Sequence, residues 1–233
     1  MPSQGKVEAV LAIGGYNLVQ NLALPVGAYV PANLAATAGL IALARRFGCS
    51  WEELGLRPSH LVRGFRTGLI GVGAALTVAV MATGHRRVRP YLLDQRAADQ
   101  RRRDVVYRVL VRLPLGTALF EEVAFRGVIE AIWRRAGSDP RDAATVAAIG
   151  FALWHLIPGT QALDGNPLDQ HVNSALTRAG VVTLGALLTG LASLGFSRMR
   201  ARSGSLMAPW LTHAAVNSAM YLTGVAAWRR ATS

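Results

Sequence analysis

The chain has 233 residues, of which 52% are apolar and only 16% charged, and its mean hydropathy is +0.30. A soluble domain usually carries about 25% charged residues, so this composition indicates a membrane protein. The net charge is +12. The arginines flank apolar runs, as they do in membrane proteins, which argues against nucleic-acid binding. The single cysteine, Cys49, excludes an intrachain disulfide and is interpreted as a small packing residue.

The N-terminal part is the longest uncharged stretch of the chain. Residues 9–44 contain no charged side chain over 36 positions, which is enough for two membrane spans of about 20 residues each. The break between them is expected at Leu24–Gly27. Lys6 and the apolar residues after it are read as the start of a first span, not as a removed signal peptide.

Further along the chain, apolar runs alternate with basic or polar connections. The next three segments are a basic connection, a third span and a second basic connection with an interfacial amphipathic helix, at 45–66, 67–84 and 85–104. Then come a fourth span, a fifth span that begins at Ser138-Asp139-Pro140, a polar loop and two more spans, at 105–133, 143–157, 158–178, 179–196 and 205–228.

These runs predict an all-α, polytopic integral membrane helix bundle of about seven transmembrane helices. Six or eight are the alternatives if the N-terminal half is misread. The whole chain, 1–233, is expected to form a single membrane domain. Lys and Arg divide twelve to twelve between the two sides of a seven-span arrangement, so the positive-inside rule predicts no orientation.

The fourth span carries charged residues in its middle. Glu122, Arg126 and Glu130 follow one another at i, i+4 spacing, so they share a helix face and can pair. The simplest interpretation of Glu122 and Arg126 is an ion pair that fixes helix positions. Successive residues of an α-helix are about 100° apart, so Glu121 lies off this row and has no partner on its own helix. An ionisable residue at membrane depth is costly and often functional.

Two later spans also carry polar side chains. His155 is the only ionisable residue between Ala143 and Leu163. Alone it is most simply a core histidine, and its neighbour Trp154 a packing residue. In the last span, His213 and Asn217 lie one turn apart and share a face, either as an inter-helix hydrogen-bond pair or as two groups addressing one ligand.

A shared interior cavity would accommodate Glu121, His155, His213 and Asn217 together. Such a set suits two hydrolytic chemistries. In the first, a glutamate activates water while the imidazole and amide groups stabilise an oxyanion. In the second, Glu121, His155 and His213 hold a zinc ion that activates the water. The zinc motif H-E-x-x-H is absent.

Three motifs occur in order, each on its own predicted span: EEVAFR at 121–126, FALWH at 151–155 and HAAVN at 213–217. They match the patterns E-E-x-x-x-R, F-x-x-x-H and H-x-x-x-N. In this order they resemble the CPBP family, which comprises the type II CAAX prenyl endopeptidases and the Abi-type bacteriocin-processing or immunity proteins. The resemblance covers about residues 113–225, which it marks as a catalytic core. The N-terminal third is similar only in being hydrophobic.

The resemblance implies an intramembrane endopeptidase in which Glu121 and His155 activate water, His213 and Asn217 form the oxyanion site, and Glu122 and Arg126 are supporting. A glutamate mechanism without a cofactor is favoured, with a zinc-dependent protease as the alternative. The expected partners are a membrane-associated peptide or protein substrate and the lipid bilayer of a bacterial inner or plasma membrane. A non-catalytic immunity or binding protein with the same fold, and a proton-coupled transporter, are the other hypotheses.

Overall fold

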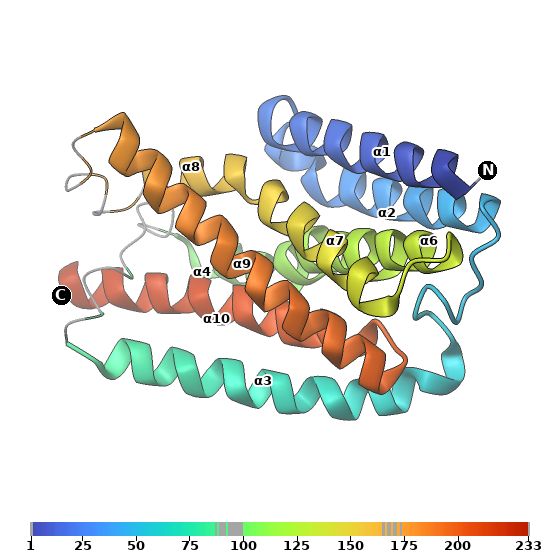
Figure 1. Ribbon diagram of the computed structural model, residues 1–233. Coiled ribbons are helices and arrows are strands. Elements are labelled where there is room, and N and C mark those ends of the chain that lie inside the picture. Colours follow the sequence, from blue (N-terminus) through green and yellow to red (C-terminus); the bar gives the residue numbers. More distant parts are fainter. Residues whose placement is uncertain are drawn as a thin grey trace.

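A computed structural model of the chain describes residues 2–86, 88, 92, 100–164, 166, 169, 172 and 174–232. In these residues the regular structure is entirely helical and contains no strand. The helices form seven rods that run between two ends of the molecule, and the two termini lie at opposite ends (Figure 1). The predicted all-helical bundle is therefore confirmed.

The rods follow one another along the chain with short connections. The first three are α1 (Pro2–Leu22), α2 (Tyr29–Arg46) and α3 (Leu61–Gly84), and the short turns η1 (Val26–Ala28) and η2 (Pro58–His60) precede α2 and α3. The fourth, called here the central rod, joins α4 (Arg102–Tyr107), η5 (Arg108–Ala118), α5 (Leu119–Glu122), η6 (Val123–Ile129) and α6 (Glu130–Arg135). The last three are α7 (Pro140–Trp154) with α8 (Leu156–Asp164), then α9 (Ala175–Ser203) and α10 (Met207–Thr232).

Four helical segments in the described part of the chain are long and apolar enough to cross a membrane. They are Val26–Arg46, Pro58–Gly84, Pro140–Asp164 and Ala175–Ser203. The structure thus supports a helical membrane protein, but it does not confirm a count of about seven transmembrane helices. The central rod falls outside the four because it carries Glu121, Glu122, Arg126 and Glu130 among its apolar residues.

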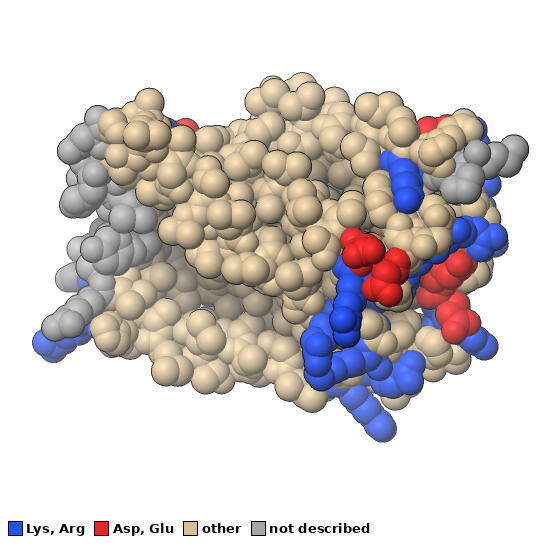
Figure 2. Space-filling view, in the orientation of Figure 1, with Lys and Arg blue, Asp and Glu red and all other residues tan. Residues whose placement is uncertain are grey.

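The distribution of side chains is inverted relative to a soluble protein. Large apolar residues such as Ile70 on α3 and Leu191 on α9 are exposed, whereas Glu122 and Arg126 are fully buried. On the face shown in Figure 2, uncharged side chains cover the middle, and charged ones gather mainly near the end where α3 begins and α9 ends. An apolar belt around a polar interior is the arrangement expected of a protein surrounded by lipid.

Two boundaries differ from the sequence-based expectation. Helix α3 begins at Leu61, within the connection expected at 45–66, because Pro58 occupies the first position of the preceding turn and initiates the helix. Residues 158–164 belong to α8 although a loop was expected there, since Pro158 lies in the first turn, where a missing N–H is tolerated. The amphipathic helix expected within 85–104 lies mostly outside the described residues.

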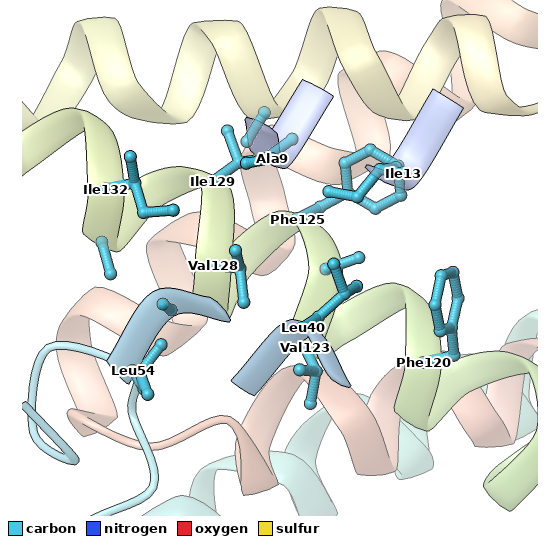
Figure 3. Packing of buried hydrophobic residues seen from close by; sticks show 14 of the residues in the cluster. Ala9, Ile13, Leu40, Leu54, Phe120, Val123, Phe125, Val128, Ile129 and Ile132 are labelled. Atoms are coloured by element: carbon cyan, nitrogen blue, oxygen red, sulfur yellow. The ribbon is translucent and has the colours of Figure 1, made fainter. Parts of the chain in front are cut away.

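The hydrophobic core surrounds the second half of the central rod. Phe120, Val123, Phe125, Val128, Ile129 and Ile132 are buried there against Ala9 and Ile13 of α1, Leu40 of α2, and Leu54 (Figure 3). From Phe120 to Ile132 every residue of the rod is buried. The two adjacent glutamates stand at the start of this run, so the packing that buries the rod also removes their carboxylates from water.

The central rod departs from ordinary α-helical geometry on both sides of these glutamates. Residues 108–118 and 123–129 are wound as π-helix, with α5 (Leu119–Glu122) between them. Pro114 lies inside the first π-helical stretch, where it supplies no backbone N–H. Its carbonyl oxygen instead accepts a hydrogen bond from Nε1 of Trp210 on α10, at 2.8 Å. π-Helical turns are frequent at functional sites.

Candidate active site

The first motif forms a buried ion pair on the central rod. Nη1 of Arg126 lies 3.1 Å from Oε1 of Glu122, as the i, i+4 spacing predicts, and both side chains are fully buried. The guanidinium carbon of Arg126 also lies 4.1 Å from the ring centre of Phe151 and 5.1 Å from that of Phe196. The two aromatic rings can hold the cation in place where water does not reach it.

Glu130 does not continue this row. Its Oε2 lies 3.3 Å from Nη1 of Arg200 on α9, and both residues are buried. Arg200 also donates from Nη2 to the backbone oxygen of Glu53 in the connection between α2 and α3. The sequence could not identify this partner, because Arg200 is 70 residues away along the chain. Glu130 therefore belongs to a second buried ion pair, which joins the central rod to α9.

His213 on α10 contacts both adjacent glutamates. Its Nδ1 lies 2.7 Å from Oε1 of Glu122, and its Nε2 lies 3.5 Å from Oε2 of Glu121. The imidazole stacks on Phe196, with ring centres 5.2 Å apart, and meets the ring of Phe151 edge-on at 5.8 Å. The two carboxylates, which point about 100° apart on a regular helix, thus meet at opposite nitrogens of one imidazole ring.

His155 lies at the break between α7 and α8, where the helix interruption directs its side chain towards Glu121. Its Nδ1 is 2.7 Å from the carbonyl oxygen of Phe151. A carbonyl oxygen can only accept, so Nδ1 carries the proton and Nε2 is the free nitrogen of a neutral ring. That Nε2 lies 4.0 Å from Oε2 of Glu121. The same carboxylate oxygen therefore faces Nε2 of His155 and Nε2 of His213.

Trp154 takes part in this arrangement beyond the packing role expected of it. Its indole Nε1 donates a hydrogen bond to Oε1 of Glu121 at 3.1 Å, and both residues are buried. Oε2 of Glu121 is buried without a hydrogen-bond partner among the described residues. The indole thereby fixes which oxygen faces the two histidines. The only signal in the sequence was the position of Trp154 directly before the histidine of the second motif.

Asn217 is placed beside this cluster, not within it. It lies one turn beyond His213 on α10, is half-buried, and lines a cavity of about 530 Å³. Thr117, one turn before Glu121 on the central rod, lines the same cavity, as do Tyr29 and Arg112. The structure therefore brings Glu121, His155 and His213 together, and Asn217 opens onto adjacent space that can receive part of a substrate.

The residues do not fit a His₂Glu zinc site. Zinc ligands lie about 2.0–2.2 Å from the metal in a tetrahedral arrangement. Here Oε2 of Glu121 is 3.5 Å from one Nε2 and 4.0 Å from the other. In the described part of the chain, no group of three or more His, Cys, Asp or Glu side chains is arranged to hold a metal ion.

Comparison with known proteins identifies the family. Residues 104–219, roughly half of the chain, match the family model described as type II CAAX prenyl endopeptidase Rce1-like. This region contains all three motifs and every residue of the cluster around Glu121. Comparisons with curated proteins and with solved structures gave no match. The chain is thus an integral membrane protein that belongs to the Rce1-like type II CAAX prenyl endopeptidases, a family of membrane proteases.

Proposed function

We propose that this protein is an intramembrane endopeptidase that hydrolyses a peptide bond with a water molecule activated by Glu121. One observation carries the proposal. Oε2 of Glu121 is buried, has no hydrogen-bond partner among the described residues, and faces the Nε2 atoms of two histidines. A water molecule in this space would meet one base and two imidazole nitrogens, which is the arrangement that general base catalysis requires.

The other motif residues have distinct roles in this proposal. Oε2 of Glu121 takes a proton from water, and His155, held through Nδ1 by the Phe151 carbonyl, orients that water with Nε2. The water oxygen attacks the peptide carbonyl, and the resulting oxyanion lies towards α10, where His213 and Asn217 donate to it. Glu122 and Arg126 support His213 from below. Residues 113–225 then form the catalytic core.

We propose that no metal takes part, which is consistent with the poor fit of the three side chains to a zinc site. The test is elemental analysis of the purified protein together with treatment by a chelator. Proteolysis that survives the chelator is the expected result. Stoichiometric zinc whose removal abolishes proteolysis and whose return restores it would contradict the proposal.

The proposed substrate is a membrane-associated peptide or protein, and the proposed location is the inner or plasma membrane of a bacterium. We further propose that all seven rods cross the bilayer, since the three that are less apolar carry the polar residues that face the interior. The substrate can be found by comparing membrane peptides of a wild-type strain with those of a Glu121→Gln strain. Peptides that accumulate uncut in the variant are expected. Identical peptide profiles would contradict the proposed activity.

A further inference from the structure

His213 is the one imidazole in the cluster that lies between two carboxylates. Glu122 meets its Nδ1 at 2.7 Å, and Glu121 faces its Nε2 at 3.5 Å. The stacked ring of Phe196 and the edge-on ring of Phe151 hold the imidazole plane. Because both nitrogens face an acceptor, the position of the ring proton determines what His213 can do in the reaction.

The ion pair with Arg126 determines that position. Oε1 of Glu122 accepts from Nη1 of Arg126 at 3.1 Å and is the same atom that faces Nδ1 of His213. A guanidinium remains charged in proteins, and this one is completely buried, so Glu122 is its compensating carboxylate. An ionised carboxylate can only accept hydrogen bonds. Nδ1 of His213 must therefore be the donor, which leaves Nε2 without a proton in the neutral ring.

We propose that Glu122 is the positioning residue for His213: with Arg126 it holds the imidazole in the Nδ1–H form, so that Nε2 can exchange a proton with Glu121. A buried carboxylate fixes the tautomer of a catalytic histidine in the same way in serine-protease triads. The inference rests on the proposed function, and it assigns to the second glutamate of the motif a role separate from holding the helices together.

The reaction then balances as follows. The O–H bond of water breaks, its proton goes to Oε2 of Glu121, and its oxygen bonds to the peptide carbon, whose C=O electron pair moves to oxygen. The proton passes from Glu121 to Nε2 of His213, which can then donate to the oxyanion. As the oxyanion collapses, the C–N bond breaks, its electron pair stays on nitrogen, and the leaving amine takes the proton from Nε2. Glu121 and His213 return to their starting states.

The tautomer can be measured without any substrate. Protein labelled with ¹⁵N in its histidines is placed in phospholipid nanodiscs at pH 8, where an ordinary imidazole, with a pKa of about 6.5, is neutral. NMR then shows which ring nitrogen is bonded to hydrogen, and the His213 signals are identified by their loss in His213→Gln. We expect one proton, on Nδ1. A proton on Nε2, with or without one on Nδ1, would overturn the proposal.

A double variant tests whether Glu122 is the cause. In Glu122→Met with Arg126→Met, the buried pair is replaced by apolar groups, so no unpaired charge is left to unfold the protein. The acceptor then nearest to His213 is Glu121, and we expect the proton to move to Nε2. The matched control is Glu130→Met with Arg200→Met, which removes the other buried pair and should leave the proton on Nδ1. Retention of Nδ1–H in the first double variant would overturn the role of Glu122.

These results are separable from the proposed function. Because the NMR measurement contains no substrate, its outcome does not depend on whether the protein cleaves peptides. If Glu121→Gln abolishes proteolysis while His213 carries its proton on Nε2, the proposed function stands and this inference fails. If the proton is on Nδ1 but wild type and Glu121→Gln leave the same membrane peptides uncut, the tautomer assignment stands and its proposed catalytic use fails.

Discussion

Nε1 of Trp154 donates a hydrogen bond to Oε1 of Glu121 across 3.1 Å, and the two side chains come from different rods of the bundle. The bond orients the carboxylate, because it occupies one oxygen and turns the other towards His155 and His213. The indole ring itself packs against Phe120 and Phe125, with ring centres 5.2 and 5.9 Å away. Trp154 therefore combines a packing role with the positioning of the proposed base.

Removal of this single hydrogen bond should slow turnover. In Trp154→Phe the aromatic packing is largely kept, but Glu121 loses a donor worth about 1.5–3 kcal/mol. We expect kcat to fall about tenfold or more, with little change in KM, since the bond orients the base and does not bind substrate. The control is Trp133→Phe, which lies outside the cluster. Equal kcat values for the two variants would show that the indole has no positioning role.

Removal of Arg126 alone should destabilise the protein more than removal of its whole ion pair. Arg126→Ala leaves the carboxylate of Glu122 buried without its compensating charge, which typically costs about 3–5 kcal/mol. The double variant Glu122→Met with Arg126→Met avoids that penalty and should unfold at a higher denaturant concentration than Arg126→Ala. The measurement is chemical unfolding in detergent micelles. A double variant less stable than the single one would contradict the buried-pair interpretation.

Helix α3 lies so close to the start of α10 that one of its glycines leaves no room for a side chain. A Cβ atom on Gly64 would lie 2.7 Å from Cβ of Ser205 and 2.9 Å from Cβ of Met207. Gly64→Ala should therefore lower stability by about 1–3 kcal/mol through overpacking. Gly73 on the same helix has open space around it and is the matched control. Gly73→Ala should leave the thermal unfolding temperature unchanged or raise it.

The connection between α2 and α3 should lose stability in acid. The backbone N–H of Ser50 hydrogen-bonds to the Glu53 carboxylate, and together with Arg135 it lowers the pKa of Glu53 below its ordinary value. This stabilisation is complete above the ordinary pKa and is lost as the pH falls through the lowered one. Because Glu53 is partly exposed, we expect less than about 1 kcal/mol. Unfolding midpoints at pH 7 and pH 3 should differ more in wild type than in Glu53→Gln, and an equal difference would contradict this.

The sequence predicted what depends on local spacing. The apolar runs indicated the helices, Asp139 caps α7 as the Ser138-Asp139-Pro140 signal suggested, and i, i+4 spacing paired Glu122 with Arg126. It could not predict contacts between rods. The pairing of Glu130 with Arg200 and the donation from Trp154 to Glu121 depend on how helices far apart in the chain pack together.

The candidate site shows the same limit. Spacing correctly separated Glu121 from the Glu122–Arg126 pair, but it could not show that both glutamates face one histidine. Their convergence depends on where α10 crosses the central rod and on the π-helical winding that flanks α5. Sequence spacing also put His213 and Asn217 on one face, yet only His213 reaches the carboxylates, because Asn217 lies one turn further along, beside the cavity.

The central claim is that Glu121 is the base that activates water. The most direct test is the rate of peptide cleavage by purified wild-type protein, Glu121→Gln and the control Glu130→Gln, on a peptide that accumulates uncut in the Glu121→Gln strain. General base catalysis contributes about 10²–10⁴ in rate, so Glu121→Gln should be slower by at least about a hundredfold while Glu130→Gln retains activity. Cleavage by Glu121→Gln at the wild-type rate would contradict the claim.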